Sequence, residues 1–310
     1  MASTQEIKRR IKAVTSTRQI TKAMELVSAT KMRKSQEVAL LSRPYAVESL
    51  RILGELMERS TYIPHIMEPR EVKKIATVVI ASDRGLAGSF NANVLRALER
   101  HVSQTSKEGH SFIAVGKKTR EYLERRGFSI TQSFSGFGDY GDAAQVKPLT
   151  TFIVEGFLKG EWDQVTVIST HFRSTLRQEV MTRRVLPIDA ATVKKTVREL
   201  VPEYGRYSGA GKDVFGSASL DEKKDFEYLI EPNPKAALDA LAPALVEIML
   251  YDLILEANAS EHSARMVAMK NASENAAELK DELSVEYNKS RQAAITREIA
   301  EVVSGAEALT

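Results

Sequence analysis

The fold is decided by residues 244–304, which read ALVEIMLYDLILEANASEHSARMVAMKNASENAAELKDELSVEYNKSRQAAITREIAEVVS. These 61 residues include neither Gly nor Pro and are rich in Ala, Leu, Glu and Lys, which favour helix. We therefore expect one uninterrupted helix of roughly 90 Å, at about 1.5 Å of rise per residue. A compact domain built from the rest of the chain has a radius of gyration of only about 20 Å, so part of this helix must project from it.

The C-terminal end of this helix carries an apolar stripe. Its members recur at helical spacing and are Ile295, Ile299, Val302, Val303 and Leu309. Chain ends are usually polar and frayed, so an apolar end indicates a surface that a partner covers. The alternative is a C-terminal helix that docks on its own domain.

A second long helix is expected at the N-terminus. Ser3 and Glu6 form a capping box, and apolar residues then recur at spacings of four and three: Ile7, Ile11 and Val14, then Ile20, Met24 and Val27. No Gly or Pro occurs before Pro44, which gives about 40 residues or roughly 60 Å of helix. Residues 1–43 hold ten Lys or Arg against three Glu, whereas residues 247–310 hold twelve Asp or Glu against six Lys or Arg. Segments of opposite charge are suited to lying against each other.

The basic residues near the N-terminus also allow another interpretation. Lys8, Arg9, Arg10 and Lys12 are typical of a patch that binds nucleic acid or an anionic lipid surface. No aromatic side chains are interleaved with them to stack on bases, so no nucleic-acid partner is expected.

Between the two helices, the sequence alternates between strand-like and helix-like segments. Near-continuous apolar runs predict buried strands at residues 74–82, 112–116, 129–134 and 164–169. Helices are expected between and around them at residues 91–106, 117–126 and 148–158. This order predicts a parallel sheet with helices on its faces. Residues 178–186 alternate like an added edge strand, residues 196–225 are charged and rich in Gly like an exposed insertion, and residues 226–230 predict a short last strand.

Composition excludes several classes of protein. The chain has 310 residues, is 43% apolar and 27% charged, and therefore is globular in class. It contains no cysteine, which removes disulfides, thiolate metal sites and cysteine nucleophiles, and an intracellular location fits. The first residues lack the apolar core of a signal peptide and no run of eighteen apolar residues occurs, so we expect a chain that does not cross a membrane by itself.

One glycine motif raises the possibility of a dinucleotide-binding enzyme. Gly136–Gly141 reads GFGDYG, which satisfies G-x-G-x-x-G and follows a predicted strand. However, it follows the third strand, Pro148 stands where the phosphate-binding helix should be running, and Glu161 and Asp163 precede the next strand instead of ending it. A flexible glycine loop is the simpler interpretation.

The other motifs do not indicate an enzyme that acts alone. Gly209–Asp213 resembles the end of a phosphate loop, but Arg206 occupies the place of the upstream Gly and Asp213 that of the Ser or Thr. The histidines show no metal-ligand spacing, and no catalytic serine motif or paired carboxylates occur. No cofactor or metal is expected.

The short motif Asp83–Leu86 allows two interpretations. An Asp and an Arg at the carboxyl end of a parallel strand lie where α/β proteins usually place ligands. Alternatively, the Asp side chain bonds to nearby backbone and shapes a turn from strand to helix.

Segments from the whole chain resemble one known family. They are ITKAME at 20–25, KMRK at 31–34, SDRGL at 82–86, ARMVAMK at 264–270, YNK at 287–289, RQA at 291–293 and ITREIAEVVSGA at 295–306. Together they resemble the gamma subunit of the F-type ATP synthase. Residues 196–225 are longer than in many bacterial members, and the regulatory cysteine pair of chloroplast members is absent.

The resemblance implies the architecture. It implies an α/β fold in which long N- and C-terminal helices form an antiparallel coiled coil and flank a Rossmann-like domain with a mostly parallel sheet. The implied parts are an N-terminal helix at 1–60, a globular domain at 70–235 with the insertion at 196–225, and a C-terminal helix at 236–310. If the helices start level, the second outreaches the first by about 20 residues, or roughly 30 Å.

The resemblance also implies the function and the partners. The implied function is a non-catalytic central rotating stalk, which couples ion flow through the membrane to ATP synthesis or hydrolysis and regulates the ATPase activity. Its partners would be the hexamer of alpha and beta subunits, the epsilon subunit and the ring of c subunits, with one copy of the chain per complex. It would lie peripherally on the cytoplasmic side of a bacterial cell membrane. A coiled-coil scaffold without rotary function and a dinucleotide-binding enzyme are the alternatives.

The resemblance further implies the residues at two contacts. Contacts with the beta subunits are implied for Met24, Arg265, Arg291, Gln292, Thr296, Glu298 and Glu301. The alternative for these residues is ordinary coiled-coil stability, above all for Arg265. The contact with the c ring is implied for Tyr228 and Glu231, beside a turn that Pro232 and Pro234 make rigid.

Overall fold

The computed structural model describes residues 4–59, 62–105, 109–140, 142–188 and 230–307. The chain divides into two compact units: residues 1–28 with 265–310, here the tip unit, and residues 29–264, here the base unit. Helices α1 (Thr4–Arg59) and α7 (Pro234–Glu307) each contribute to both units. The domain boundaries implied by the resemblance remain a prediction. The expected insertion at 196–225 and most of the expected strand at 226–230 lie outside the described residues, as do Ser3, Leu309 and the Gly209 motif.

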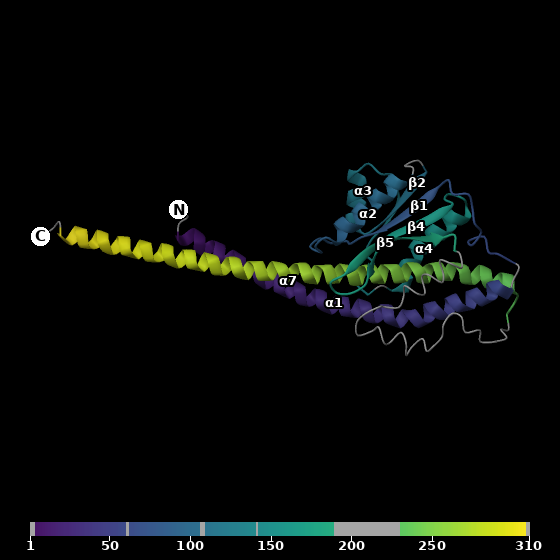
Figure 1. The fold of residues 1–310 in the computed structure, drawn as a ribbon, viewed down its shortest axis with the longest axis horizontal. Helices are drawn as coiled ribbons and strands as arrows, with labels where there is room; N and C mark the ends of the chain where they lie inside the picture. The colour runs from purple at the N-terminus through teal and green to yellow at the C-terminus, as the bar shows by residue number, and fades with distance from the viewer. Residues whose placement is uncertain (1–3, 60–61, 106–108, 141, 189–229, 308–310) are drawn as a thin grey trace. The chain divides into compact units, whose positions relative to one another are not determined.

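The base unit contains a five-stranded sheet in the order β3-β2-β1-β4-β5. Its strands are β1 (Ile75–Ile80), β2 (His110–Val115), β3 (Ile130–Phe134), β4 (Gln164–Phe172) and β5 (Gln178–Leu186). β1 pairs in parallel with β2 and β4, and β2 pairs in parallel with β3. β5 pairs antiparallel with β4 and lies at the edge (Figure 1), which confirms the mostly parallel sheet with one added strand.

Helices cover both faces of this sheet (Figure 1). α2 (Phe90–Gln104) and α3 (Lys117–Arg125) lie on one face, and α4 (Ala143–Leu158) lies on the other face with the base part of α7. Successive residues of β1 point to opposite faces, so Val79 joins the apolar cluster with α2 while Val78 and Ile80 join the cluster with α4 and α7. Burial on both faces explains the near-continuous apolar runs of the central strands.

Two helix starts differ from the sequence prediction. α4 begins at Ala143, before Pro148, because the Asp142 side chain accepts a hydrogen bond from the Ala144 N–H at 3.1 Å and caps the helix. The uninterrupted helix expected over 244–304 is present but begins earlier, at Pro234, and passes through Pro243. Asn233 accepts the Ala236 N–H at 2.9 Å, and Pro at the first helical position needs no N–H partner. Each helix begins directly after its capping residue, Asp142 or Asn233, and continues through a later proline, Pro148 or Pro243.

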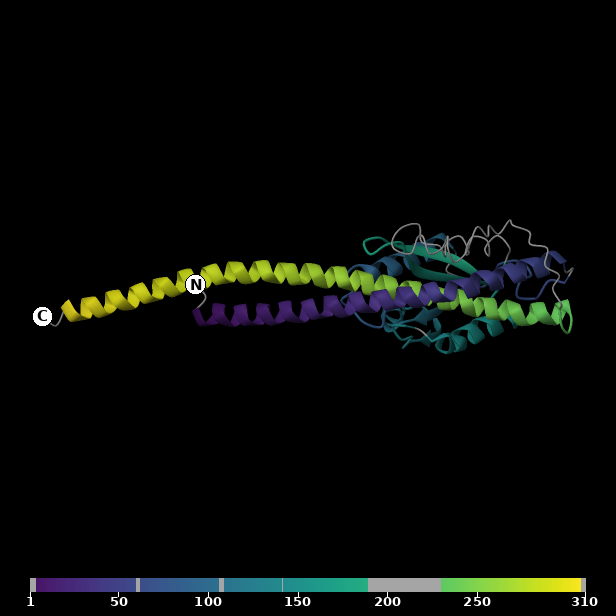
Figure 2. The ribbon, with the colours of Figure 1, turned by 90° about the horizontal axis from the view of Figure 1, so that it is seen from below.

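In the tip unit, α1 and α7 run side by side in opposite directions, as both ribbon views show (Figure 2). On α1, Ile7, Thr21 and Ser28 are buried and Val14 is half-buried, a spacing of seven residues. A seven-residue repeat of inward positions is typical of a coiled coil. On α7, the buried positions of the tip unit are Arg265, Met269, Ser273 and Ala276.

Candidate functional site: helix surfaces and their attachment to the sheet

The C-terminal part of α7 is uncovered within the described tip unit. Every residue from 291 to 304 is exposed. The apolar side chains Ile295, Ile299, Val302 and Val303 are 46%, 59%, 71% and 51% exposed. Figure 1 shows this end of α7, in yellow, continuing past the first residues of α1. The predicted apolar stripe is therefore free of cover from the described chain, as a partner surface should be.

The residues implied in contacts with the beta subunits all lie in the tip unit. Five of them are exposed on the last turns of α7: Arg291, Gln292, Thr296, Glu298 and Glu301. The Thr296 hydroxyl donates to the Gln292 carbonyl at 2.9 Å, so its hydrogen is bound within its own helix. Met24 is half-buried on α1, and Arg265 on α7 is only 8% exposed. Arg265 thus has little surface to offer a partner.

The residues implied in the c-ring contact belong to the segment before α7. Glu231 is exposed and precedes the Asn233 cap of the helix. Tyr228 lies outside the described residues. The contact of this pair with the c ring therefore remains a prediction.

The Asp83 motif shapes the turn after β1. The Asp83 Oδ1 atom accepts the Lys117 N–H at 2.9 Å, and Oδ2 accepts the Gly136 N–H at 3.0 Å. Lys117 follows β2 and Gly136 follows β3, so one carboxylate ties together the carboxyl ends of three strands. Both oxygens are engaged by backbone, which favours the turn-shaping interpretation over a ligand site.

Gly116, between β2 and α3, lets these strand ends approach. Its φ angle is +94°, and a Cβ atom there would lie 2.1 Å from the Ala81 carbonyl oxygen. Its N–H donates to the Phe134 carbonyl at 2.9 Å. Only glycine fits this close approach, so the carboxyl ends of the strands around Asp83 pack closely together.

Residues 136–142, here the glycine loop, do not form a phosphate cradle. The Gly136 N–H is bound to Asp83, and the Gly138 N–H donates to the Gln145 side chain at 3.2 Å. Asp142 at the end of the loop caps α4. A dinucleotide site needs such N–H groups free to meet a phosphate. The geometry therefore does not support the dinucleotide-binding alternative.

The glycine loop instead contacts α1 through Asp139. The Lys31 Nζ atom lies 2.5 Å from the Asp139 Oδ2 atom, and the Ser35 hydroxyl donates to the Asp139 carbonyl at 2.8 Å. Lys31 and Ser35 are four residues apart and hence share one face of α1. The loop therefore holds α1 by both a charge and a backbone contact.

The same loop contacts α7. The His262 Nε2 atom lies 2.9 Å from the Asp139 Oδ1 atom, and the Asn258 side chain donates to the Gly138 carbonyl at 3.1 Å. Burial on its own would raise the pKa of the Asp139 carboxyl group, whereas the hydrogen bond and charge of Lys31 and the charge of His262 lower it. The attractive contacts prevail, and the pKa of Asp139 is lowered. Asp139 is thus held in its charged form between the two helices.

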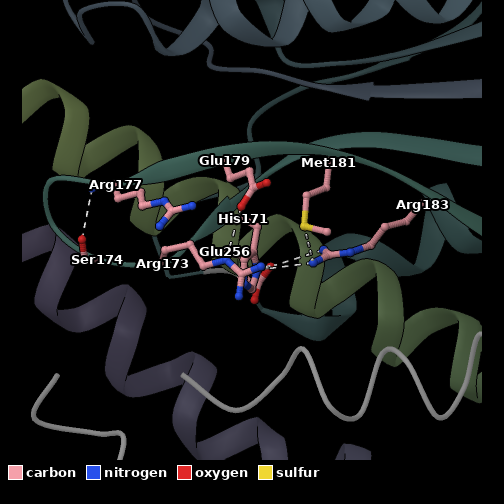
Figure 3. Close-up of polar contacts among 8 residues, drawn as sticks. All are labelled: His171, Arg173, Ser174, Arg177, Glu179, Met181, Arg183 and Glu256. Carbon is pink, nitrogen blue, oxygen red and sulfur yellow. Dashed lines mark hydrogen bonds and ion pairs between the residues drawn. The ribbon is translucent and has the colours of Figure 1, made fainter. Parts of the chain in front are cut away.

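A second polar cluster attaches α7 to the sheet (Figure 3). The Glu256 Oε2 atom lies 2.7 Å from the His171 Nδ1 atom and 3.4 Å from the Arg183 Nη1 atom. The side chains of His171 and Glu256 are each 5% exposed, and that of Arg183 is 12% exposed. His171 belongs to β4 and Arg183 to β5, so the cluster joins two strands to the helix.

The turn between β4 and β5 adds a further contact with α7. The Ser263 hydroxyl donates to the Thr175 carbonyl at 2.7 Å and accepts from the Gln178 side chain at 3.3 Å. The Arg177 N–H donates to the Ser174 hydroxyl at 3.1 Å and shapes the turn (Figure 3). Ser263 is fully buried.

Sequence reasoning did not predict these attachments. The signal was the set of polar residues that follows the apolar residues 253–255, among them Glu256, Asn258 and His262. Such polar residues need partners when they are buried, but the sequence does not say which.

The described residues provide neither a metal site nor a membrane-spanning helix. Among them, no group of three or more His, Cys, Asp or Glu side chains is placed to hold a metal ion. The helices described here include none with enough length and apolar character to span a bilayer.

These features define a class of protein: an α/β protein with a Rossmann-like, mostly parallel sheet and two long helices, one of which has an exposed end. The sequence model of the family described as "ATP synthase" matches residues 3–309. The "ATP synthase gamma chain" of Moorella thermoacetica is 40% identical over 311 residues, which cover 100% of both chains. That of Roseiflexus castenholzii is 40% identical over 314 residues, which cover 100% of this chain and 99% of the relative. The chain belongs to the family of ATP synthase gamma chains.

Solved structures share the fold. A chain in the cryo-EM structure of the Euglena gracilis mitochondrial ATP synthase (OSCP/F1/c-ring) has a TM-score of 0.64 at 16% identity, and the match covers 99% of this chain and 94% of that one. A chain of the Tetrahymena thermophila mitochondrial ATP synthase, described as central stalk/c-ring, has a TM-score of 0.58 at 24% identity, covering 82% of this chain and 99% of that one. These likenesses support the mostly parallel sheet flanked by long helices.

Proposed function

We propose that this chain is the central rotating stalk of an F-type ATP synthase and carries no catalytic site of its own. The observation that carries the proposal is the uncovered end of α7, where an apolar stripe is exposed over residues 291–304. An apolar surface of this kind calls for a partner. Membership of the gamma-chain family supplies the partner: the hexamer of alpha and beta subunits.

Rotation follows from the asymmetry of two paired helices. The helices present different side chains in each direction, so a pair placed among three chemically alike beta subunits contacts each of them differently. Differential contact biases each beta subunit toward a different conformation, and turning the pair exchanges those biases. Ion flow that drives the rotation is thereby coupled to ATP synthesis, and ATP hydrolysis is coupled to reverse rotation. The same contacts let the chain regulate the ATPase activity.

The side chains that make this contact are proposed to be those at the end of α7 and one on α1. Arg291, Gln292, Thr296, Glu298 and Glu301 are exposed, and they combine both charges with hydrogen-bonding groups. Met24 adds a flexible apolar contact from α1. Arg265 is buried, and we assign it to the inner packing of the helices instead.

The foot of the stalk is proposed to be the segment before α7. Tyr228 and Glu231 would contact the c ring, and the base unit would also contact the epsilon subunit. Glu231 is exposed and is followed by Pro232 and Pro234, which restrict the backbone. We further propose that one copy of the chain lies at the cytoplasmic side of a bacterial cell membrane, as a peripheral subunit.

Reconstitution tests the rotary function. The chain is assembled with the alpha, beta and epsilon subunits and the membrane sector, and a bead is attached to a cysteine introduced in the base unit. The native chain has no cysteine, so the bead has one site on it. We expect the bead to turn during ATP hydrolysis and the vesicles to pump ions. Assembly and hydrolysis with a stationary bead would instead support the scaffold alternative.

Crosslinking tests the foot separately. Glu231→Cys should crosslink to a cysteine introduced in the polar loop of the c subunit. Glu161→Cys, in the exposed turn between α4 and β4, is the matched control. A crosslink from Glu161→Cys without one from Glu231→Cys would show that the foot lies elsewhere on the base unit.

A further inference from the structure

The polar attachments of α7 lie on two faces of one short stretch of the helix. Glu256 and Ser263 are seven residues apart and share one face, and Asn258 and His262 are four residues apart and share another. At about 100° per residue, the centres of the two faces are roughly 130° apart around the helix axis. We name these four residues and their partners the collar. The partners are His171, Arg183, Thr175 and Gln178 on the hairpin side and Gly138 and Asp139 in the glycine loop.

Each face meets a different part of the base unit. Glu256 and Ser263 contact the β4–β5 hairpin, while Asn258 and His262 contact the glycine loop. Three of the four helix residues are nearly buried: Glu256 is 4% exposed, His262 5% and Ser263 0%. The helix is thus held from two directions within about two turns.

Polar contacts of this kind resist a motion that apolar packing tolerates. Apolar attraction depends on buried area and has no preferred direction. Hydrogen bonds are directional and weaken steeply when the angle from donor through hydrogen to acceptor falls below about 120°. Rolling α7 by 30° would move side-chain atoms about 6 Å from its axis by roughly 3 Å. Such a roll would break the contacts on both faces at once.

The burial of charge points the same way. A buried ion pair contributes little to stability, since apolar side chains of equal volume often do as well or better. Its best-attested use is to fix one arrangement among several that would pack equally well. The His171–Glu256–Arg183 cluster has this character, because it lies beside the apolar core that already holds α7 to the sheet.

We infer that the collar fixes the angle of α7 about its own axis, so that torque passes between the base unit and the helix without slip. This inference rests on the proposed rotary function and goes beyond it, because it names the residues inside the chain that keep rotation in phase. Asp139 serves both helices, since it also binds Lys31 and Ser35 on α1. The collar side chains are positioning residues, and none of them needs to touch another subunit.

The test removes each face of the collar in the reconstituted complex. Glu256→Gln with Ser263→Ala weakens the hairpin face, and Asp139→Asn with Asn258→Ala weakens the loop face. Glu99→Gln is the matched control, because Glu99 accepts hydrogen bonds from Tyr122 and Arg126 within the base unit and does not belong to the collar. The readout is the ratio of ATP-driven ion pumping to ATP hydrolysis in the same vesicles, which a loss of assembled complex alone would not change.

We expect each single-face variant to lower this ratio by less than about two-fold and the four-substitution variant by about five-fold or more, because contacts that share one task are not additive. The control should keep the native ratio. A native ratio in the four-substitution variant would overturn the inference while leaving the proposed function intact. Absence of pumping in the native complex would overturn the proposed function itself.

A crosslink keeps the inference falsifiable if variants assemble poorly. Thr175→Cys with Ser263→Cys introduces two thiols at neighbouring residues, because the Ser263 hydroxyl donates to the Thr175 backbone carbonyl at 2.7 Å, in a chain otherwise free of cysteine. In the background of the weakened loop face, oxidation should restore the ratio and reduction should lower it again. A ratio that stays low after the disulfide forms would contradict the inference. Complete failure of the four-substitution variant to assemble would also contradict it, since the collar would then build the fold.

Discussion

Two stretches of the same helix, α7, have opposite surroundings. Residues 245–259 include no exposed position, and residues 291–304 include no buried one. Both are helical and free of Gly and Pro. An isolated helix of some 14 residues is marginal in water, so the outer stretch depends on continuing a helix that is already formed. The difference shows that the inner stretch is selected for packing on its own chain, whereas the outer stretch is suited to packing on a partner.

The largest effect on stability is expected when a buried side chain of the inner stretch is truncated. Leu250 is 0% exposed and lies in the core cluster with the sheet and α4. Leu250→Ala should lower the free energy of unfolding of the purified chain by about 2–5 kcal/mol, because it removes packed methyl groups and leaves a cavity. Urea unfolding measures this. A loss below about 1 kcal/mol would show that the inner stretch is not held by its own domain.

The matching substitution in the outer stretch should behave in the opposite way. Ile299 is 59% exposed. Ile299→Ala should change the unfolding free energy of the purified chain by less than about 0.5 kcal/mol. It should weaken binding to the alpha and beta hexamer by about 1–3 kcal/mol, because a partner buries that side chain. Urea unfolding measures the stability of the native and Ile299→Ala chains, and titration of the hexamer measures their binding. Loss of stability without loss of binding would reverse the comparison.

A smaller effect is expected from a charge on the outer stretch. Glu298→Lys should alter ATP hydrolysis or coupled pumping by up to about five-fold, since an exposed ion pair contributes only about 0–1 kcal/mol. The yield of assembled complex should not change. Glu161→Lys, an exposed change of the same kind in the base unit, should leave turnover at the native value. Equal turnover in all three complexes would argue against a coupling role for Glu298.

The smallest effect is the pH dependence of the stability that Asp139 confers on the attachment of the helices. The pKa of Asp139 is lowered in the folded chain, so the stability it confers is present above its unfolded pKa of about 4 and is lost as the pH falls through the lower folded value. Asp139→Asn should therefore be less stable than the native chain at pH 7, and the gap should narrow toward pH 3. Unfolding midpoints at several pH values measure this. A gap that widens in acid would contradict the assignment.

Much of the fold was predictable because its signals are local. The long helices, the alternation of strand and helix and the edge strand Gln178–Leu186 all follow from periodicity within short windows. The start of α4 was misplaced because capping by Asp142 outweighed the proline signal, whereas α7 begins at Pro234, close to the expected residue 236. Asp83 illustrates the limit: its sequence allowed a ligand site or a turn, and only the positions of two other strand ends favour the turn.

The attachments of α7 could not be predicted for a different reason. Glu256 and His171 are 85 residues apart, and Lys31 and Asp139 are 108 residues apart, so no local pattern joins them. The partner contacts at Glu298 and Glu231 remain predictions, because they depend on surfaces that belong to other chains.

The pairing of the two terminal helices in the tip unit has a consequence for biosynthesis. Residues 4–28 are synthesised before the segment with which they pair, which begins at residue 265. The intervening 236 residues take roughly 10 to 50 seconds to synthesise at about 5–20 residues per second. During that time the sheet can form, but the inward side chains of α1, among them Ile7, are not yet covered by α7. This part of α1 is therefore made early but paired late, and its inward side chains stay uncovered in between.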